Sequence, residues 1–291
     1  MDLPFAVTTP MRDADTNTRA VFAVPPGACD THFHVFEPGY EHVPNPQYTF
    51  PDGTLDQYLA LTEVLGIDRM VIVQPTYYGE DNSLTLDVLE RLGKRARGVV
   101  RVAEDVDPAL LAEFDRRGVR AVRLDLFARK SEPIAAIENY ITRMASLVAP
   151  LGWHLQFYSP GSVIRDLIPF LSRLDARFVI DHMGYMKASD GFGGADVERL
   201  LTLLQTGNCW IKLTGPYRVA GDAPMSAVDP LGRALVATRA DRLLWGSDWP
   251  HLPDGQRDTG ELLNLLAAWA PDPADRESIL VTSPDTLFFA H

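Results

Sequence analysis

The sequence predicts one α/β domain folded as a (β/α)8 TIM-type barrel, and three observations support this prediction. Short apolar segments alternate strictly with longer amphipathic ones, which is typical of parallel strands joined by helical crossovers. The chain has 291 residues, 46% hydrophobic and 23% charged, which suits one such barrel. An open dinucleotide-binding sheet is the alternative, but its G-x-G-x-x-G fingerprint is absent after the first strand.

Residues 1–26, which are rich in proline and weakly periodic, are expected to form an N-terminal arm, and residues 27–291 the barrel. The eight expected strands are 28–35, 70–74, 98–102, 121–126, 154–157, 178–180, 210–213 and 243–246. The eight expected helices, with apolar residues at i, i+3 and i+4, are 55–65, 83–92, 108–117, 134–151, 162–174, 195–205, 229–238 and 258–269. Pro108 at a first turn, and Gly66 and Gly93 just past last turns, support these boundaries.

Charge and composition exclude several classes of partner. The formal net charge of −12 argues against nucleic acid and against an anionic membrane surface, because the long-range field repels phosphate. No apolar run approaches the ~18 residues of a membrane span, and no secretory signal opens the chain, so we expect a cytoplasmic protein. Cys29 and Cys209 lie in apolar runs and are expected to be buried, reduced thiols. The sequence does not predict an oligomeric state.

Polar residues gather where the expected strands end, which is where barrel enzymes place their active sites. His32 and His34 lie one pleat apart and therefore point to the same side of the first strand. The list continues with Gln74, Thr76 and Tyr77 on the second strand, Arg123 and Arg129 on the fourth, Tyr158 on the fifth, Asp181 and His182 on the sixth, Lys212 to Arg218 on the seventh, and Asp248 to His251 on the eighth. An isolated His-X-His pair is equally compatible with a solvated strand, so this convergence carries the prediction. His154 opens its strand and is expected to be a core histidine instead.

Four motifs resemble the amidohydrolase superfamily, and within it the lactonase branch that includes 2-pyrone-4,6-dicarboxylate lactonase. The resemblance runs from about residue 25 to the C-terminus. The motifs are Asp30-Thr31-His32-Phe33-His34, Val179-Ile180-Asp181-His182-Met183-Gly184, Trp210-Ile211-Lys212-Leu213-Thr214-Gly215-Pro216-Tyr217-Arg218 and Leu244-Trp245-Gly246-Ser247-Asp248-Trp249-Pro250-His251.

The resemblance implies a role for each matching residue. The catalytic set would be Asp248, His182, His32 and His34, and the residues gripping substrate carboxylates would be Arg123, Arg129, Arg218 and Tyr158, with Tyr48, Thr76 and Tyr77 in loops that close the pocket. The chain lacks the bridging lysine or glutamate that binuclear members carry on the fourth or fifth strand, which argues against a two-metal centre.

The resemblance, together with these residues, implies a hydrolase that opens the ring of a carboxylated lactone, such as 2-pyrone-4,6-dicarboxylate, a sugar-acid lactone or a muconolactone. Asp248 would be the general base for water attack, and the imidazoles would polarise the carbonyl. No cofactor is expected to be required, although His32, His34, His182 and Asp248 could bind one Zn²⁺ or Mn²⁺ ion. The alternatives are a lactone isomerase or decarboxylase on the same scaffold, or a non-catalytic protein that binds anionic sugar acids.

Overall fold

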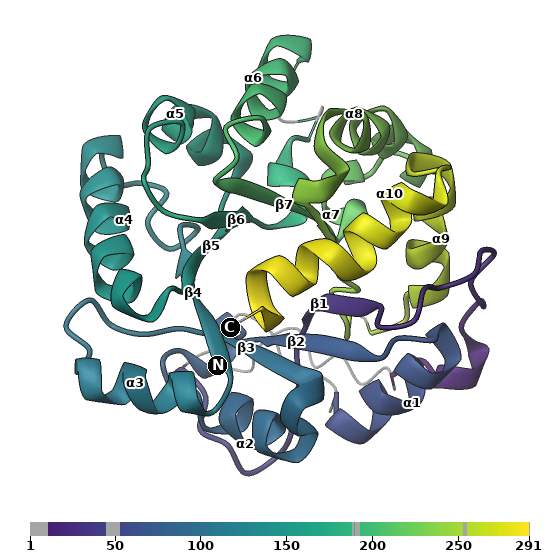
Figure 1. The fold of residues 1–291 in the computed structure, drawn as a ribbon, viewed down its shortest axis with the longest axis horizontal. Helices are drawn as coiled ribbons and strands as arrows, with labels where there is room; N and C mark the ends of the chain where they lie inside the picture. Colours follow the sequence, from purple (N-terminus) through teal and green to yellow (C-terminus); the bar gives the residue numbers. More distant parts are fainter. Residues whose placement is uncertain (1–10, 45–52, 188, 190–192, 253–254, 291) are drawn as a thin grey trace, which may run out of the picture.

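Eight parallel strands, each hydrogen-bonded to the next along the chain, form the centre of the computed structural model, as predicted (Figure 1). The structure describes residues 11–44, 53–187, 189, 193–252 and 255–290. The strands are β1 (Cys29–Phe33), β2 (Arg69–Val73), β3 (Ala96–Val100), β4 (Val119–Asp125), β5 (His154–Tyr158), β6 (Phe178–Ile180), β7 (Cys209–Leu213) and β8 (Leu243–Trp245). The predicted (β/α)8 barrel is therefore confirmed, with strand ends that differ from expectation by two residues at most.

Helices surround the barrel on its outside (Figure 1). They are α1 (Leu55–Leu65), α2 (Ser83–Leu92), α3 (Pro108–Arg116), α4 (Ile134–Val148), α5 (Gly161–Leu171), α6 (Gly194–Leu204), α8 (Asp229–Arg239) and α9 (Thr259–Trp269). Two short helices lie elsewhere: α7 (Pro216–Ala220) follows β7 at the mouth of the barrel, and α10 (Pro273–Glu277) begins the C-terminal segment. Local sequence sets their ends: Thr54 and Gln57 form a capping box on α1, and Gly66 ends that helix in the left-handed conformation. The sequence did not predict α7 or α10.

Residues that follow β8 close the barrel onto β1. The amide of Asp248 donates to the carbonyl of His32 at 2.8 Å, and the amide of His34 donates to the carbonyl of Trp249 at 2.9 Å. Gly246 allows this approach, since a Cβ there would lie 2.5 Å from the Cβ of His32. The closure therefore sets Asp248 directly beside the two histidines.

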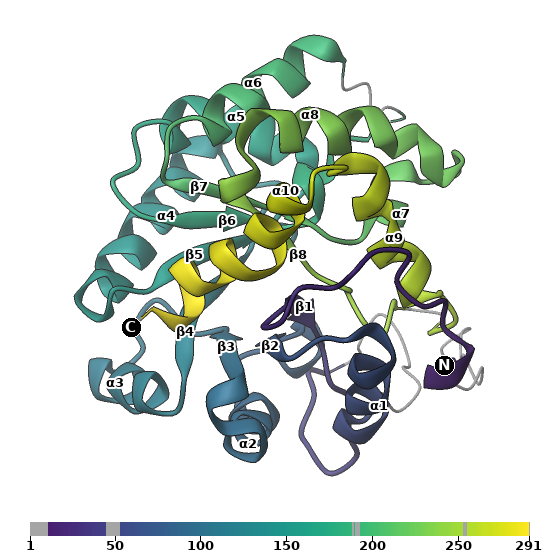
Figure 2. The ribbon, with the colours of Figure 1, turned by 45° about the vertical axis from the view of Figure 1, so that its right-hand side comes forward.

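The C-terminal segment, which sequence analysis left unassigned, closes the end of the barrel opposite the predicted site. After α10 the chain continues through two π-helical segments, Ser278–Thr282 and Asp285–Phe289, and Figure 2 shows this stretch crossing the barrel. Phe288 is fully buried among inward-facing strand residues, and its ring lies 4.8 Å from the ring of buried His154. His154 is thus a core residue, as predicted.

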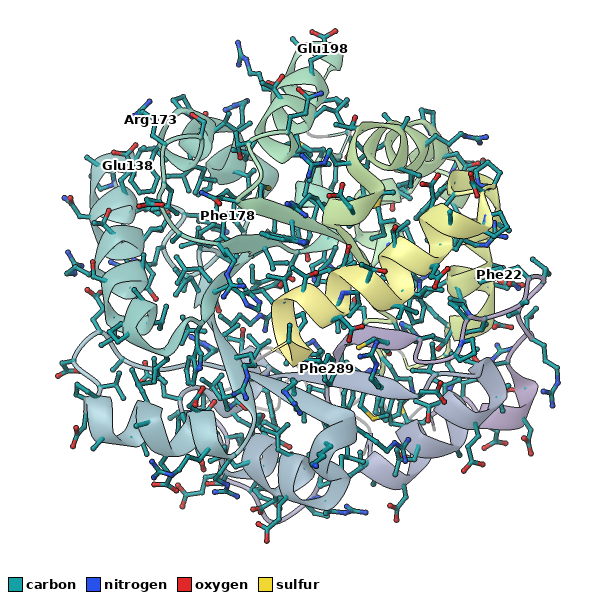
Figure 3. All side chains as sticks on the ribbon, viewed as in Figure 1. Phe22, Glu138, Arg173, Phe178, Glu198 and Phe289 are labelled. Carbon is teal, nitrogen blue, oxygen red and sulfur yellow. The ribbon has the colours of Figure 1, made fainter. Side chains whose placement is uncertain are left out.

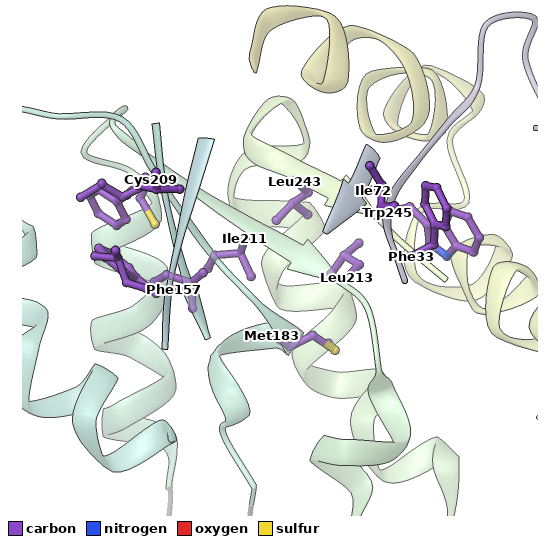
Figure 4. Packing of buried hydrophobic residues seen from close by; sticks show 14 of the residues in the cluster. Phe33, Ile72, Phe157, Met183, Cys209, Ile211, Leu213, Leu243 and Trp245 are labelled. Carbon is purple, nitrogen blue, oxygen red and sulfur yellow. The ribbon is translucent and has the colours of Figure 1, made fainter. Parts of the chain in front are cut away.

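A second apolar layer lies between the strands and the helices. Phe33 stacks on Tyr58 of α1 with ring centroids 3.8 Å apart, and Figure 4 shows Phe33 and Trp245 together at the β1–β8 junction. Charged side chains such as Glu138, Arg173 and Glu198 lie on the outer rim in Figure 3. Both cysteines are buried free thiols, as predicted.

The described part of the predicted N-terminal arm, residues 11–26, lies against the start of α9. Asp258 accepts hydrogen bonds from the amide and hydroxyl of Thr18 and pairs with Arg12. Gly260 faces the Thr18 carbonyl so closely that any Cβ would overlap it. Among the described residues, no helix has the length and apolar character needed to cross a membrane.

Candidate active site

An irregularity in β1 turns both histidines of the His-X-His motif into the barrel. Cys29 faces the inner core, and strict alternation from it would point His32 outward. The pairing with β2 changes register after Asp30, whose buried carboxylate accepts hydrogen bonds from the amides of His32 (3.0 Å) and Ser247 (2.9 Å). His32 and His34 consequently share one side, as expected, and each points its Nε2 toward Asp248.

The two carboxylate oxygens of Asp248 have different surroundings. Oδ2 accepts hydrogen bonds from the Tyr217 hydroxyl at 2.5 Å and from Nε of Arg218 at 2.6 Å. Oδ1 is buried without a hydrogen-bond partner among the described residues, and it lies 3.7 Å from Nε2 of His32 and 3.8 Å from Nε2 of His34. One oxygen is therefore fixed by two donors, and the other is available to a ligand between the histidines.

His182 completes the group from the end of β6. It adopts a positive φ of 51°, and its ring centroid lies 5.0 Å from that of His32. Gly215 makes room for it: a Cβ there would lie 2.7 Å from Nδ1 of His182 and 3.2 Å from Oδ2 of Asp248. The predicted catalytic residues Asp248, His182, His32 and His34 are thus brought together in one cluster.

The cluster combines neutral imidazoles with an ionised carboxylate. Burial lowers the pKa of His34 to about 3, aided by Arg123, and lowers the pKa of His182 to about 4; burial also holds the pKa of His32 well below its ordinary value. Burial alone would raise the pKa of Asp248, but Arg218 and the imidazoles outweigh it and hold that pKa well below its usual range. Near neutral pH, Asp248 is a carboxylate and the histidines are uncharged.

A buried polar network supports this cluster from inside the barrel; sequence analysis placed Asp181 and Lys212 at the mouth without a role and did not include Gln156. Nζ of Lys212 donates to the Thr31 carbonyl at 2.7 Å and to Oε1 of Gln156 at 2.9 Å, and it lies 3.3 Å from Nδ1 of His32. Asp181, 3.4 Å from Nδ1 of His32, also accepts from Nε2 of Gln156 at 3.1 Å. Burial lowers the pKa of Lys212 to about 8. The sequence signal that could have revealed this network is a polar residue within an otherwise apolar strand, such as Lys212 in β7.

The predicted substrate-binding residues fall into two groups. Arg123 is buried near the cluster, donates to the Gln74 carbonyl at 3.1 Å, and has its guanidinium 4.3 Å from the ring centroid of Tyr158. The ring of Tyr158 lies 6.1 Å from that of His182. Arg218 is the partner of Asp248 described above. These three residues therefore line the catalytic cluster.

The remaining predicted residues are placed differently. Arg129 pairs with Glu132 at 3.0 Å and Glu104 at 3.3 Å and stacks on Tyr140. Thr76 donates to Asp125 at 3.0 Å. Tyr77 packs edge-on against Phe36 and stacks on His42, and Tyr48 lies outside the described residues. The side chain of Gln74 bonds to Thr85 of α2, away from the barrel interior.

The donor set fits one divalent cation. His32, His34 and Asp248 form one group with ligand atoms within 4.8 Å of one another, and His32, Asp181 and His182 form a second group that shares His32. Nε2 of His32, Nδ1 of His182 and Oδ1 of Asp248 are buried and lack hydrogen-bond partners among the described residues. Neutral imidazole and carboxylate are ligands that Zn²⁺ and Mn²⁺ accept, so the observed residues are compatible with such an ion.

The barrel and this cluster define an enzyme whose reactive groups stand at the carboxyl ends of parallel strands. The chain belongs to the amidohydrolase family, whose model matches residues 29–289. It is 37% identical over 274 residues to a 4-sulfomuconolactone hydrolase of Rhizobium radiobacter, covering 92% of this chain and 91% of that protein.

Two further comparisons agree with this assignment. The chain is 33% identical over 282 residues to a 2-pyrone-4,6-dicarboxylate hydrolase of Comamonas testosteroni, covering 92% of each chain. A crystal structure of an Agrobacterium tumefaciens protein in the apo form superposes with a TM-score of 0.81 and 28% identity, covering 91% of this chain and 97% of that one. The resemblance inferred from the motifs is thereby confirmed: the chain lies in the branch of the family whose named members act on lactones.

Proposed function

We propose that this protein hydrolyses the ring ester of an anionic lactone, with Asp248 as general base. The observation that carries the proposal is the asymmetry of Asp248: Tyr217 and Arg218 hold Oδ2, while Oδ1 faces the histidines without a hydrogen-bond partner among the described residues. A water molecule bound at Oδ1 would lose its proton to this oxygen as it attacks the lactone carbonyl. Such proton transfer contributes on the order of 10²–10⁴-fold to a rate.

The neighbouring groups would stabilise the oxyanion that forms during the attack. The uncharged rings of His32 and His182 can each donate one N–H toward the developing negative charge. His34 instead gives its Nδ1–H to the Val73 carbonyl at 2.7 Å, so its Nε2 faces the site as an acceptor. Asp181 and Lys212 contact Nδ1 of His32 and would hold the orientation of its ring. The protonated base would then return its proton to the departing ring oxygen.

The anionic character of the proposed substrate follows from the charge of the pocket. Arg123 is buried and makes no hydrogen bond to a carboxylate of the described residues; its nearest carboxylate oxygen, on Asp181, lies 3.9 Å away. Its positive charge would therefore attract an anionic group of the substrate although the net charge of the protein is −12. The two named relatives act on lactones that carry carboxylate or sulfonate groups, which supports the same substrate class here. Arginine forks would bind such groups bidentately and orient the ring.

We propose that a metal ion is optional. If one divalent cation is present, we expect His32, His34, His182 and Asp248 to hold it, and it would supply Lewis-acid polarisation and a more acidic bound water. The ligand atoms of His32, His34 and Asp248 lie within 4.8 Å of one another, whereas His182 forms such a group with His32 and Asp181. The lactone is already an activated ester, and the arginines place positive charge near its carbonyl, so the residues alone offer a route to hydrolysis.

A turnover screen with product analysis tests the proposal. Lactones with two, one or no anionic substituents would be incubated with the protein, and the products followed by NMR. Ring opening of the anionic members is the expected result. Migration of the ester linkage would show an isomerase, release of CO₂ a decarboxylase, and binding without turnover a non-catalytic binding protein.

A further inference from the structure

Arg101 occupies a position in the barrel mouth that neither the motifs nor the cluster above includes. It follows β3 directly and lies two residues after Val99, which faces the inner core, so alternation points Arg101 inward as well. Val100 pairs with Val122 of β4, and continuing this register sets Arg101 beside Arg123. The two arginines thus occupy neighbouring backbone positions at the same level of the barrel.

Neighbouring residues neutralise the positive charge of the Arg101 side chain only weakly. Its nearest carboxylate is Asp125, 3.9 Å away, and its guanidinium makes no hydrogen bond to any residue that the structure describes. Asp125 is already engaged, because it accepts from the Thr76 hydroxyl at 3.0 Å and the Ala128 amide at 3.2 Å. The backbone of Arg101, in contrast, is held by two hydrogen bonds with the side chain of Asn82.

Arg129, the arginine expected from the sequence to join Arg123, has the opposite surroundings. Its guanidinium pairs with Glu104 and Glu132 and lies 4.0 Å from the ring centroid of Tyr140. Recruiting it to a substrate would require breaking contacts that already neutralise it. Arg101 would gain hydrogen bonds on binding an anion and would lose none with the described residues.

The proximity of Arg101 and Arg123 also favours an anion between them. The Arg101 side chain is 19% exposed and that of Arg123 is 4% exposed, so solvent screens their repulsion only partly. Burial lowers the pKa of Arg101, and the charge of Arg123 acts in the same direction. An oxyanion that accepts hydrogen bonds from both guanidinium groups would offset the repulsion between the two positive charges.

We propose that Arg101 and Arg123 together form the site that binds an oxyanion substituent of the substrate, carboxylate or sulfonate, and that Arg101 thereby determines specificity for anionic rings. This inference rests on the proposed function for its substrate. The geometry supplies two planar donor groups on adjacent strands, and both acid types offer oxygens that such donors can share.

Binding of unreactive probes to the full-length protein tests the proposal apart from catalysis. Calorimetry would measure the affinities of benzene-1,3-dicarboxylate and 3-sulfobenzoate for the wild type, Arg101→Met, Arg101→Lys and Arg129→Met, the last of which removes the competing arginine expected from the sequence. We expect Arg101→Met to lower the affinity for the more tightly bound probe by about tenfold to a hundredfold. Arg101→Lys should lower this affinity by less, and Arg129→Met by less than about twofold. The tighter of the two probes identifies the substituent.

The outcomes separate this inference from the proposed hydrolysis. If neither probe binds the wild type, if both Arg101 variants bind within about twofold of it, or if Arg129→Met shows the larger loss, the assignment of Arg101 is wrong. Arg101→Lys retains the charge and serves as the test if circular dichroism shows that Arg101→Met does not fold. If the probes bind in an Arg101-dependent way but no lactone is turned over, the proposed hydrolysis is refuted, whereas the assignment of Arg101 to an anion-binding site is supported.

Discussion

At the scale of single residues, Asp248 is a buried carboxylate whose neighbours keep it ionised, and we propose it as the general base. Arg218 keeps it charged and Tyr217 fixes its orientation, both through Oδ2. The same low pKa makes it a weak base in water, so its usefulness depends on receiving a proton only as the oxyanion forms. The position of Asp248 next to the attacking water, rather than a high pKa, would therefore account for its contribution to the rate.

Asp248→Asn is expected to lower kcat by about a hundredfold or more and to leave KM within about threefold. The amide preserves the shape of the side chain and an acceptor for Tyr217 and Arg218, but it cannot take the proton. Steady-state kinetics on an anionic lactone measures both constants. A variant that retains more than about a tenth of wild-type kcat would exclude the role of general base.

Arg218→Met and Arg123→Met are expected to act on different kinetic constants. Arg218 donates to Asp248, so its loss should lower kcat by about tenfold or more, whereas Arg123 lies beside Tyr158 away from that bond and its loss should mainly raise KM. Parallel kinetics with an anionic and a neutral lactone would show the difference. The same pattern in both variants would contradict this division of roles.

At the scale of elements, the junction of β1 and β8 combines barrel closure with assembly of the site. The His32 carbonyl accepts from the Asp248 amide, and Asp30 bonds to the amides of both His32 and Ser247. A shift of one strand would therefore change the distances among His32, His34 and Asp248 and also weaken the closure.

Gly246→Ala is expected to destabilise the protein by about 1–3 kcal/mol or more, because the new methyl would overlap His32 and force the strands apart. Urea denaturation measures the free energy of unfolding. Gly194→Ala, at the first turn of α6 with no atom within 4 Å of the added Cβ, is the matched control and should change it by less than about 1 kcal/mol. Equal effects at both positions would disprove the packing argument.

At the scale of the whole molecule, three buried neutral histidines link stability to pH. In the unfolded chain these histidines become protonated near pH 6.5. In the folded chain their pKa values are lower, about 4 for His182 and about 3 for His34, so protonation requires a more acidic solution. The unfolded state therefore binds more protons in this range, and stability must fall as the pH falls. Asp30, whose pKa burial raises, opposes part of this trend.

The free energy of unfolding is accordingly expected to decrease by several kcal/mol between pH 7 and pH 4, because a pKa difference of one unit is worth about 1.4 kcal/mol for each histidine. Urea denaturation at several pH values would measure it. His182→Asn removes one of the titrating groups and should give a shallower slope over the same range. A stability that stays constant or rises as the pH falls to 4 would contradict the assignment of neutral histidines.

Metal removal tests the optional role of a cation. After treatment with a strong chelator, with metal below about a tenth of an equivalent by elemental analysis, kcat is expected to stay within about threefold of the untreated value. The expectation follows from an activated ester and a pocket that already holds arginine charge. A fall in activity that matches the metal lost, and that Zn²⁺ or Mn²⁺ restores, would show that the ion is required.

The sequence by itself determined the barrel and the set of polar residues that meet at its mouth, since both depend on patterns that are local in the chain. The resemblance to the amidohydrolase superfamily then singled out the proposed catalytic residues among them. Alternating strand and helix periods predict parallel strands, and polar residues at strand ends such as His32, His182 and Asp248 must then meet at one mouth. Tertiary structure decided how the charged residues are paired. It places Arg218 on Asp248, Arg129 on Glu104 and Glu132, and Lys212 beneath His32, because partners distant in the chain compete for each guanidinium or ammonium group. The irregularity of β1 and the course of the C-terminal segment were likewise settled by packing between strands and segments far apart in sequence.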